Sequence, residues 1–154
     1  GVHARPAATA APYVREARRC ISYLTIELKG AIPEELRPLV GNRVYGCDDC
    51  QLCCPWNRYA KLSAEADFAT RHDLTTARLL ELFGWDEATF LARTEGSAIR
   101  RIGYARWRRN LAVALGNAPR SDAVLQALRA ARPESPPLVQ EHIDWAFGRQ
   151  SGTA

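Results

Sequence analysis

The chain has 154 residues, 47% of them hydrophobic and 25% charged, a composition typical of a globular protein with a core of its own. Its formal net charge is only +4. No apolar run approaches the roughly 18 residues that a membrane span requires, and no signal peptide opens the sequence. These features exclude an integral membrane protein, and we expect a cytoplasmic monomer with no membrane partner. The absence of any Met, position 1 included, indicates a piece of a longer protein.

Gly, Pro and Cys interrupt the first part of the sequence as far as Ala60. Residues 1–12 have little periodicity and are predicted to be extended or disordered. Apolar residues at helical spacing follow Cys20. A short helix is expected between Pro33 and Gly41, because Pro favours the first position of a helix and Gly commonly ends one. The cysteine-rich segment comes directly after this helix.

From Lys61 onward, apolar stripes at helical spacing alternate with turn signals, which predicts a series of short helices. Asp86 is expected to cap one of them, and Ser97 is expected to cap a longer one. Each helix is too small to bury its own apolar face, so we expect antiparallel pairs stacked as repeats. The sequence therefore predicts a mainly α chain with two domains, a first one at residues 1–60 and a HEAT-like helical-repeat domain at residues 61–154.

A basic run extends from Arg100 to Arg109, where five of ten residues are arginines and none is acidic. One interpretation is a solvated helix face, because Arg keeps surfaces soluble. The other is a phosphate-binding patch, because guanidinium groups match phosphate oxygens and neighbouring aromatic rings can stack. The helical pattern places Trp107 and Leu111 toward the core. It leaves four arginines facing solvent or a ligand: Arg101, Arg106, Arg108 and Arg109.

Four of the five cysteines lie between Cys47 and Cys54, in the stretch YGCDDCQLCCPW. This clustering argues against a secreted disulfide framework and for metal or redox chemistry in a reducing compartment. A zinc site normally needs two separated Cys or His pairs, and no second pair of that spacing is present. The spacing C-x2-C-x3-C-P better matches the end of a ferredoxin ligand run, whose last Cys binds a second cluster. Cys20 can supply a missing ligand, and Cys53 is expected to be a bystander facing the core.

Two blocks of the sequence are more specific. The stretch from Arg18 to Ala60 contains CISYLTIE and GNRVYGCDDCQ, and the stretch from Thr94 to Pro119 reads TEGSAIRRIGYARWRRNLAVALGNAP. Both blocks, in this order, closely resemble the epoxyqueuosine reductase family of queuosine biosynthesis. The resemblance covers most of the chain and identifies it as a C-terminal fragment of such a protein, with a partial ferredoxin-like 4Fe-4S segment ahead of the helical repeats.

The resemblance implies a reaction and its cofactors. The family reduces the epoxide of epoxyqueuosine, at the wobble position of tRNA, to the alkene of queuosine, with an electron donor that the sequence does not identify. Two [4Fe-4S] clusters and a cobalamin are implied for the parent protein. By motif, Cys20, Cys47 and Cys50 are expected to bind one cluster and Cys54 the other. A tRNA substrate also favours phosphate contact by the four arginines.

The chain departs from the family pattern in what it lacks. The cobalamin domain, the first run of cysteine ligands and the catalytic acid of the family are missing, so no catalytic residue is assigned. Two clusters with four thiolates each need more ligands than the four cysteines assigned here. We therefore expect this fragment alone to be inactive. Two alternatives stay open, a truncated helical-repeat RNA-binding module without a complete cluster and a small zinc-bound domain.

Overall fold

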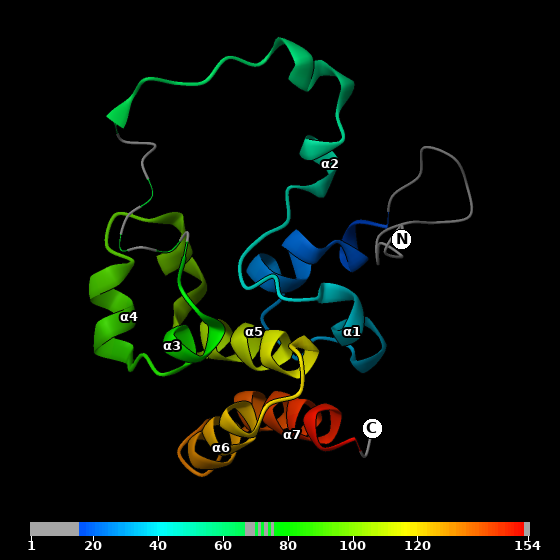
Figure 1. Ribbon diagram of the computed structural model, residues 1–154, viewed down its shortest axis with the longest axis vertical. Helices are drawn as coiled ribbons and strands as arrows, with labels where there is room; N and C mark the ends of the chain where they lie inside the picture. Colours follow the sequence, from blue (N-terminus) through cyan, green and yellow to red (C-terminus); the bar gives the residue numbers. More distant parts are fainter. Residues whose placement is uncertain (1–15, 67–69, 71, 73, 75, 153–154) are drawn as a thin grey trace.

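The computed structural model describes residues 16–66, 70, 72, 74 and 76–152. The expectation for residues 1–12 lies outside this part of the chain. The described residues are mainly helical and include no strand, which confirms the predicted fold class (Figure 1). None of their helices combines the length and the apolar character that crossing a membrane requires.

Short helical segments precede the cysteine-rich segment. A 3₁₀ turn at Ala17–Arg19 is followed by a π-helix at Tyr23–Glu27. A second 3₁₀ turn, Glu34–Leu36, leads directly into α1, Arg37–Val40. Helix α1 ends at Gly41, whose φ of 65° is a left-handed conformation that glycine adopts at little cost. The predicted short helix is therefore present, and it ends where the sequence placed its end.

The cysteine-rich segment contains α2, Asp49–Leu52, and a 3₁₀ helix at Pro55–Tyr59. Figure 1 shows that the chain from α2 onward arches away from the helical body. Its side chains are largely exposed, with Trp56 at 75% and Tyr59 at 61% of their full accessible surface. The apolar core therefore does not extend into this segment from α2 onward, whereas Tyr45 and Cys47 ahead of α2 pack against the core.

The helices of the second part pack around α5, Gly103–Asn117. Helices α3, Leu79–Phe83, and α4, Glu87–Arg93, both contact α5. Helix α7, Pro137–Ser151, runs along another side of α5 and pairs with α6, Asp122–Ala131 (Figure 1). Paired helices of this kind are compatible with stacked repeats, while the HEAT-like class and the domain boundary at residue 60 stay predictions.

Both expected helix caps are confirmed, although Ser97 caps another kind of helix than expected. Asp86 accepts a hydrogen bond from Thr89 N at 2.7 Å, and its contacts with Thr89 lower the pKa of the Asp86 carboxyl. Ser97 accepts one from Ile99 N at 3.2 Å, but the segment it caps is a 3₁₀ helix, Ala98–Ile102. The α-helix begins only at Gly103, where a φ of 72° separates the two segments.

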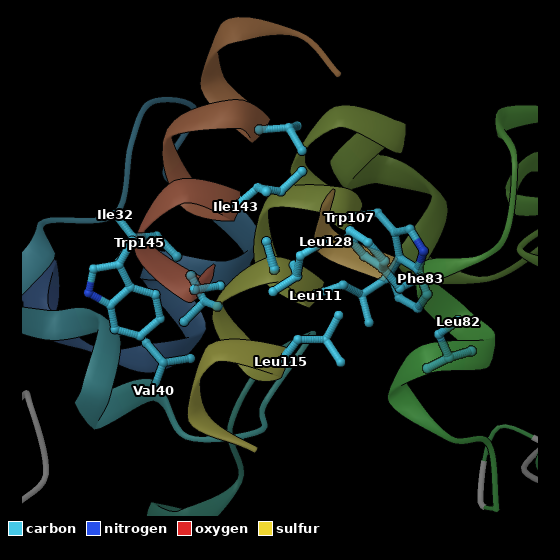
Figure 2. Packing of buried hydrophobic residues seen from close by; sticks show 14 of the residues in the cluster. Ile32, Val40, Leu82, Phe83, Trp107, Leu111, Leu115, Leu128, Ile143 and Trp145 are labelled. Atoms are coloured by element: carbon cyan, nitrogen blue, oxygen red, sulfur yellow. The ribbon is translucent and has the colours of Figure 1, made fainter. Parts of the chain in front are cut away.

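The core lies between α5 and the helices around it (Figure 2). Trp107 and Leu111 are buried, as the helical pattern predicted. Gly116 lets α5 and α7 approach each other closely, because a Cβ at this position would stand 2.6 Å from the Trp145 ring and 2.9 Å from Ala146 Cα. Only a hydrogen atom fits in that space, so the helix contact depends on glycine here.

Candidate metal centre

The segment after Cys20 is hydrogen-bonded to the backbone that carries Cys47. Ser22 Oγ donates to the carbonyl oxygen of Cys47 at 3.2 Å and accepts from Cys47 N at 3.0 Å. Thr25 Oγ1 accepts from Gly46 N at 2.9 Å. The φ of 72° at Gly46 is left-handed, so glycine suits the turn that presents these two N–H groups. Cys20 and Cys47 therefore belong to adjacent, mutually bound segments although they are far apart in sequence.

A positive charge stands beside Cys47. Arg43 Nη2 donates to both carboxylate oxygens of Asp49, at 2.9 and 3.0 Å. The hydrogen bond to Asp49 raises the pKa of Arg43, and Cys47 contributes in the same direction against the effect of burial. A guanidinium therefore lies next to Cys47, one of the predicted cluster ligands. Asp49 acts here as the ion-pair partner of Arg43.

The remaining cysteines lie on or next to α2. Cys50 and Cys53 are exposed, and Cys54 is half-buried. The expectation that Cys53 faces the core is wrong, because this segment projects away from the helical body and has no apolar interior to face. Cys53 Sγ instead lies 3.6 Å from the carbonyl oxygen of Cys50 and donates a weak hydrogen bond to it.

The donor set suits an iron–sulfur cluster in its chemistry, since soft thiolates select such clusters. Among the described residues, no three Cys, His, Asp or Glu side chains converge closely enough to bind a metal ion. Ligands need not stand at their final separations beforehand, because metal binding and the ordering of ligands are coupled. The fold thus joins the segments of two cysteines and leaves the others on an exposed segment. The ligand set stays a prediction: Cys20, Cys47, Cys50 and Cys54.

The arginines before and at the start of α5 contact the protein itself. Arg101 is exposed and forms an ion pair with Glu27. Arg106 is half-buried and donates to backbone carbonyl oxygens, among them that of Ile26 at 2.8 Å. Arg108 donates to the carbonyl oxygen of Phe83 at 2.9 Å, and its guanidinium carbon lies 4.2 Å from the centre of that ring. Backbone groups thus already occupy many of the donors that were predicted to contact phosphate.

Arg109 corrects the sequence analysis most clearly. The expectation that it faces solvent or a ligand is wrong, because its side chain is fully buried. It donates to the carbonyl oxygens of Leu24, Leu28 and Gly30 at 2.7, 2.7 and 2.6 Å. Carbonyls at the end of a helix lack partners within it, and Arg109 supplies donors to one carbonyl of the π-helix, that of Leu24, and to two that follow it. Burial lowers its pKa to about 10, so Arg109 stays charged at neutral pH.

Sequence reasoning missed three residues that organise this region, namely Ser22, Arg43 and Asn110. Nothing in the local pattern distinguishes Ser22 or Arg43 from ordinary loop and surface residues. Asn110 does carry a signal, because it lies beside Leu111 on a face that packs into the core, where an amide must find partners. It donates to the carbonyl oxygens of Thr25 at 2.7 Å and Val44 at 2.8 Å.

Known proteins resemble this chain in sequence. Residues 6–57 match a family described as a 4Fe-4S double cluster binding domain. The epoxyqueuosine reductase of Salmonella typhimurium is 66% identical over 139 residues, which cover 90% of this chain and 36% of the relative. That of Pseudomonas aeruginosa is 61% identical over 147 residues, which cover 96% of this chain and 41% of the relative. The resemblance to the epoxyqueuosine reductase family is confirmed.

Solved epoxyqueuosine reductases share the fold of this chain. The structure of the enzyme from Bacillus subtilis matches this chain with a TM-score of 0.80 at 28% identity. The match covers 90% of this chain and 37% of the Bacillus subtilis chain. An epoxyqueuosine reductase crystallised with an epoxyqueuosine-modified stem loop of tRNA-Tyr has a TM-score of 0.79 at 28% identity, with the same coverage. The chain spans 36% of the length of the Salmonella typhimurium relative.

Proposed function

We propose that this chain is part of an epoxyqueuosine reductase, an oxidoreductase that converts epoxyqueuosine in tRNA to queuosine. The observation that carries the proposal is the 66% identity to the Salmonella typhimurium enzyme, which extends over 90% of the chain. The reaction removes the epoxide oxygen as water and consumes two electrons and two protons. The match to a 4Fe-4S double cluster binding domain supports electron transfer as the contribution of this part.

Two [4Fe-4S] clusters belong to the proposal, with Cys20, Cys47 and Cys50 as ligands of one and Cys54 as a ligand of the other. A bound cluster supplies single electrons. Ser22 supports this assignment by binding both backbone groups of Cys47. Cobalamin, bound outside this chain, and an external electron donor complete the proposal. We place the protein in the cytoplasm, since a reducing compartment preserves free thiols. We also propose that it is a monomer.

Replacing Cys20, Cys47 or Cys50 by Ser, in the protein that carries this chain, is expected to lower its iron content by about half. Each change removes one thiolate from one of two clusters, and a hydroxyl is a poor ligand for them. Iron and acid-labile sulfide per chain give the measurement. Cys53→Ser is the matched control, because Cys53 is an exposed thiol of the same segment. Full iron content in all three variants, or an equal loss in the control, would contradict the ligand assignment.

The proposed substrate is tRNA, and the relative solved with a modified stem loop supports it. Among the arginines predicted to contact phosphate, Arg101 is the strongest candidate, because 58% of its side-chain surface is exposed. Arg106 and Arg108 stay in the proposal as half-buried neighbours. Arg109 does not, because its donors are committed to buried carbonyls.

Replacing Arg101 by Gln is expected to weaken tRNA binding and to reduce the slope of log affinity against log salt by about one. The reason is that each phosphate contact releases about one counterion from the RNA, so losing one contact reduces the number of released counterions by about one. Binding titrations over a range of salt concentrations measure the slope. Arg149→Gln, at an exposed position of α7, is the control with an unchanged slope. If Arg101→Gln leaves the slope unaltered, the ion pair with Glu27 accounts for Arg101 by itself.

A further inference from the structure

Two neighbouring residues of α5 bind the backbone of both cysteine-bearing segments. The amide of Asn110 donates to the carbonyl oxygen of Thr25, five residues after Cys20, and to that of Val44, three residues before Cys47. One buried side chain thus bridges the two segments. Because every donor of this amide has a backbone acceptor, the bridge has a defined geometry.

Arg109 contacts both the Asn110 amide and the π-helix. Its Nε and Nη2 donate to Asn110 Oδ1 at 3.0 and 2.9 Å, which fixes the amide in one orientation. Its Nη2 also donates to the carbonyl oxygen of Leu24. Leu24 in turn donates its N–H to the carbonyl oxygen of Cys20 at 2.9 Å. A continuous run of hydrogen bonds therefore leads from α5 to the first cysteine.

The charge of Arg109 has no carboxylate partner among the described residues. Its side chain is fully buried and its pKa, lowered by burial with Arg106 adding repulsion, still leaves it protonated at neutral pH. A buried charge that meets only carbonyl dipoles is costly to keep. The guanidinium contacts the carbonyl oxygen of Leu24, four residues after Cys20, and electrostatic interactions are screened only weakly around a buried charge.

We propose that Arg109 and Asn110 are positioning residues of the iron–sulfur site. They set the relative placement of the segments that carry Cys20 and Cys47, and the guanidinium favours the more negative, reduced state of a cluster bound there. The inference rests on the proposed function. It assigns the helical part of the chain a role in tuning electron transfer as well as in packing.

The test measures the midpoint potential and EPR spectrum of the clusters in the protein that carries this chain, together with iron content and thermal unfolding. Arg109→Gln removes the charge. Arg109→Lys keeps it but loses the fork that reaches several carbonyls at once. The matched control is Arg37→Lys, because Arg37 is also buried and donates to a carbonyl oxygen, that of Ile32, at 2.8 Å, while its ion-pair partner Glu141 lies on α7.

We expect Arg109→Gln to shift one cluster to a lower potential, and both Arg109 variants to change its EPR spectrum. Chelators should remove iron from these variants about tenfold faster at a temperature where they remain folded, as expected for losing one charged hydrogen bond. Arg37→Lys should lower thermal stability without changing the potential or the spectrum. If Arg109→Gln does not fold, the EPR spectrum and the chelation rate of Arg109→Lys test the inference.

Two results would overturn the inference, and they differ from failure of the proposed function. Unchanged spectra and chelation rates in a folded Arg109→Lys variant would leave Arg109 a purely structural residue. Equal changes in Arg37→Lys would assign the effect to global stability. A wild-type protein that never holds iron would instead refute the proposed function, and this inference with it.

Discussion

Replacing Phe90 by Ala is expected to reduce the free energy of unfolding by about 3 to 5 kcal/mol. Phe90 is fully buried in α4, and its ring centroid lies 5.5 Å from that of Trp107 and 5.9 Å from that of Tyr104. Removing the ring takes away the side chain of α4 that packs deepest against α5. The cavity can close only if this helix of seven residues moves.

Urea denaturation followed by tryptophan fluorescence measures this loss. Trp85 stacks on Trp107 at 5.7 Å, so the emission reports on the same part of the core. The control is Leu91→Ala, the next residue of the helix, which is 38% exposed and should cost less than about 1 kcal/mol. Similar losses for both variants would mean that α4 is not anchored through Phe90.

Acidification is expected to remove up to about 3 kcal/mol of stability through His142 alone. His142 is fully buried on α7. Its Nε2 accepts a hydrogen bond from Ile32 N at 3.0 Å, so the ring is neutral and Nδ1 donates to the carbonyl oxygen of Leu138 at 2.7 Å. Burial, the largest cause, lowers the pKa of His142 to about 4.

The direction of the effect follows from proton binding. Below pH 6.5 the unfolded chain protonates this histidine, whereas the folded chain does so only near pH 4. The stabilisation is therefore complete above pH 6.5 and is lost as the pH falls toward 4. Unfolding by urea at several pH values measures it, and His142→Gln should flatten the dependence in this window.

A matched control separates His142 from the carboxylates. Arg132 lowers the pKa of Asp144 below its ordinary value, so that carboxylate loses its contribution only at more acidic pH. Asp144→Asn should therefore leave the dependence between pH 6.5 and 4 unchanged. A wild-type stability that stays constant over this window would show that His142 is charged in the fold.

Local chemistry determined much of the helical framework. The period of 3.6 residues placed Trp107 and Leu111 on the buried face of α5, and Asp86 and Gly41 marked helix ends by side-chain and backbone preferences that act over a few residues. The cysteine spacing and the two characteristic blocks likewise sufficed to indicate the family. Such features depend on residues that are close in the sequence, so they can be read from the sequence alone.

Tertiary structure alone decided which polar groups face each other. Helical periodicity puts Arg109 beside Arg108 on a basic face, yet Arg109 is buried because carbonyls from a segment about 80 residues away approach it. The bonds from Ser22 to Cys47 arise in the same way. Cys53 is exposed because its segment leaves the core, which no pattern within eight residues can reveal. Contacts between distant segments depend on the path of the whole chain, so sequence patterns indicated the ligands but not the residues that position them.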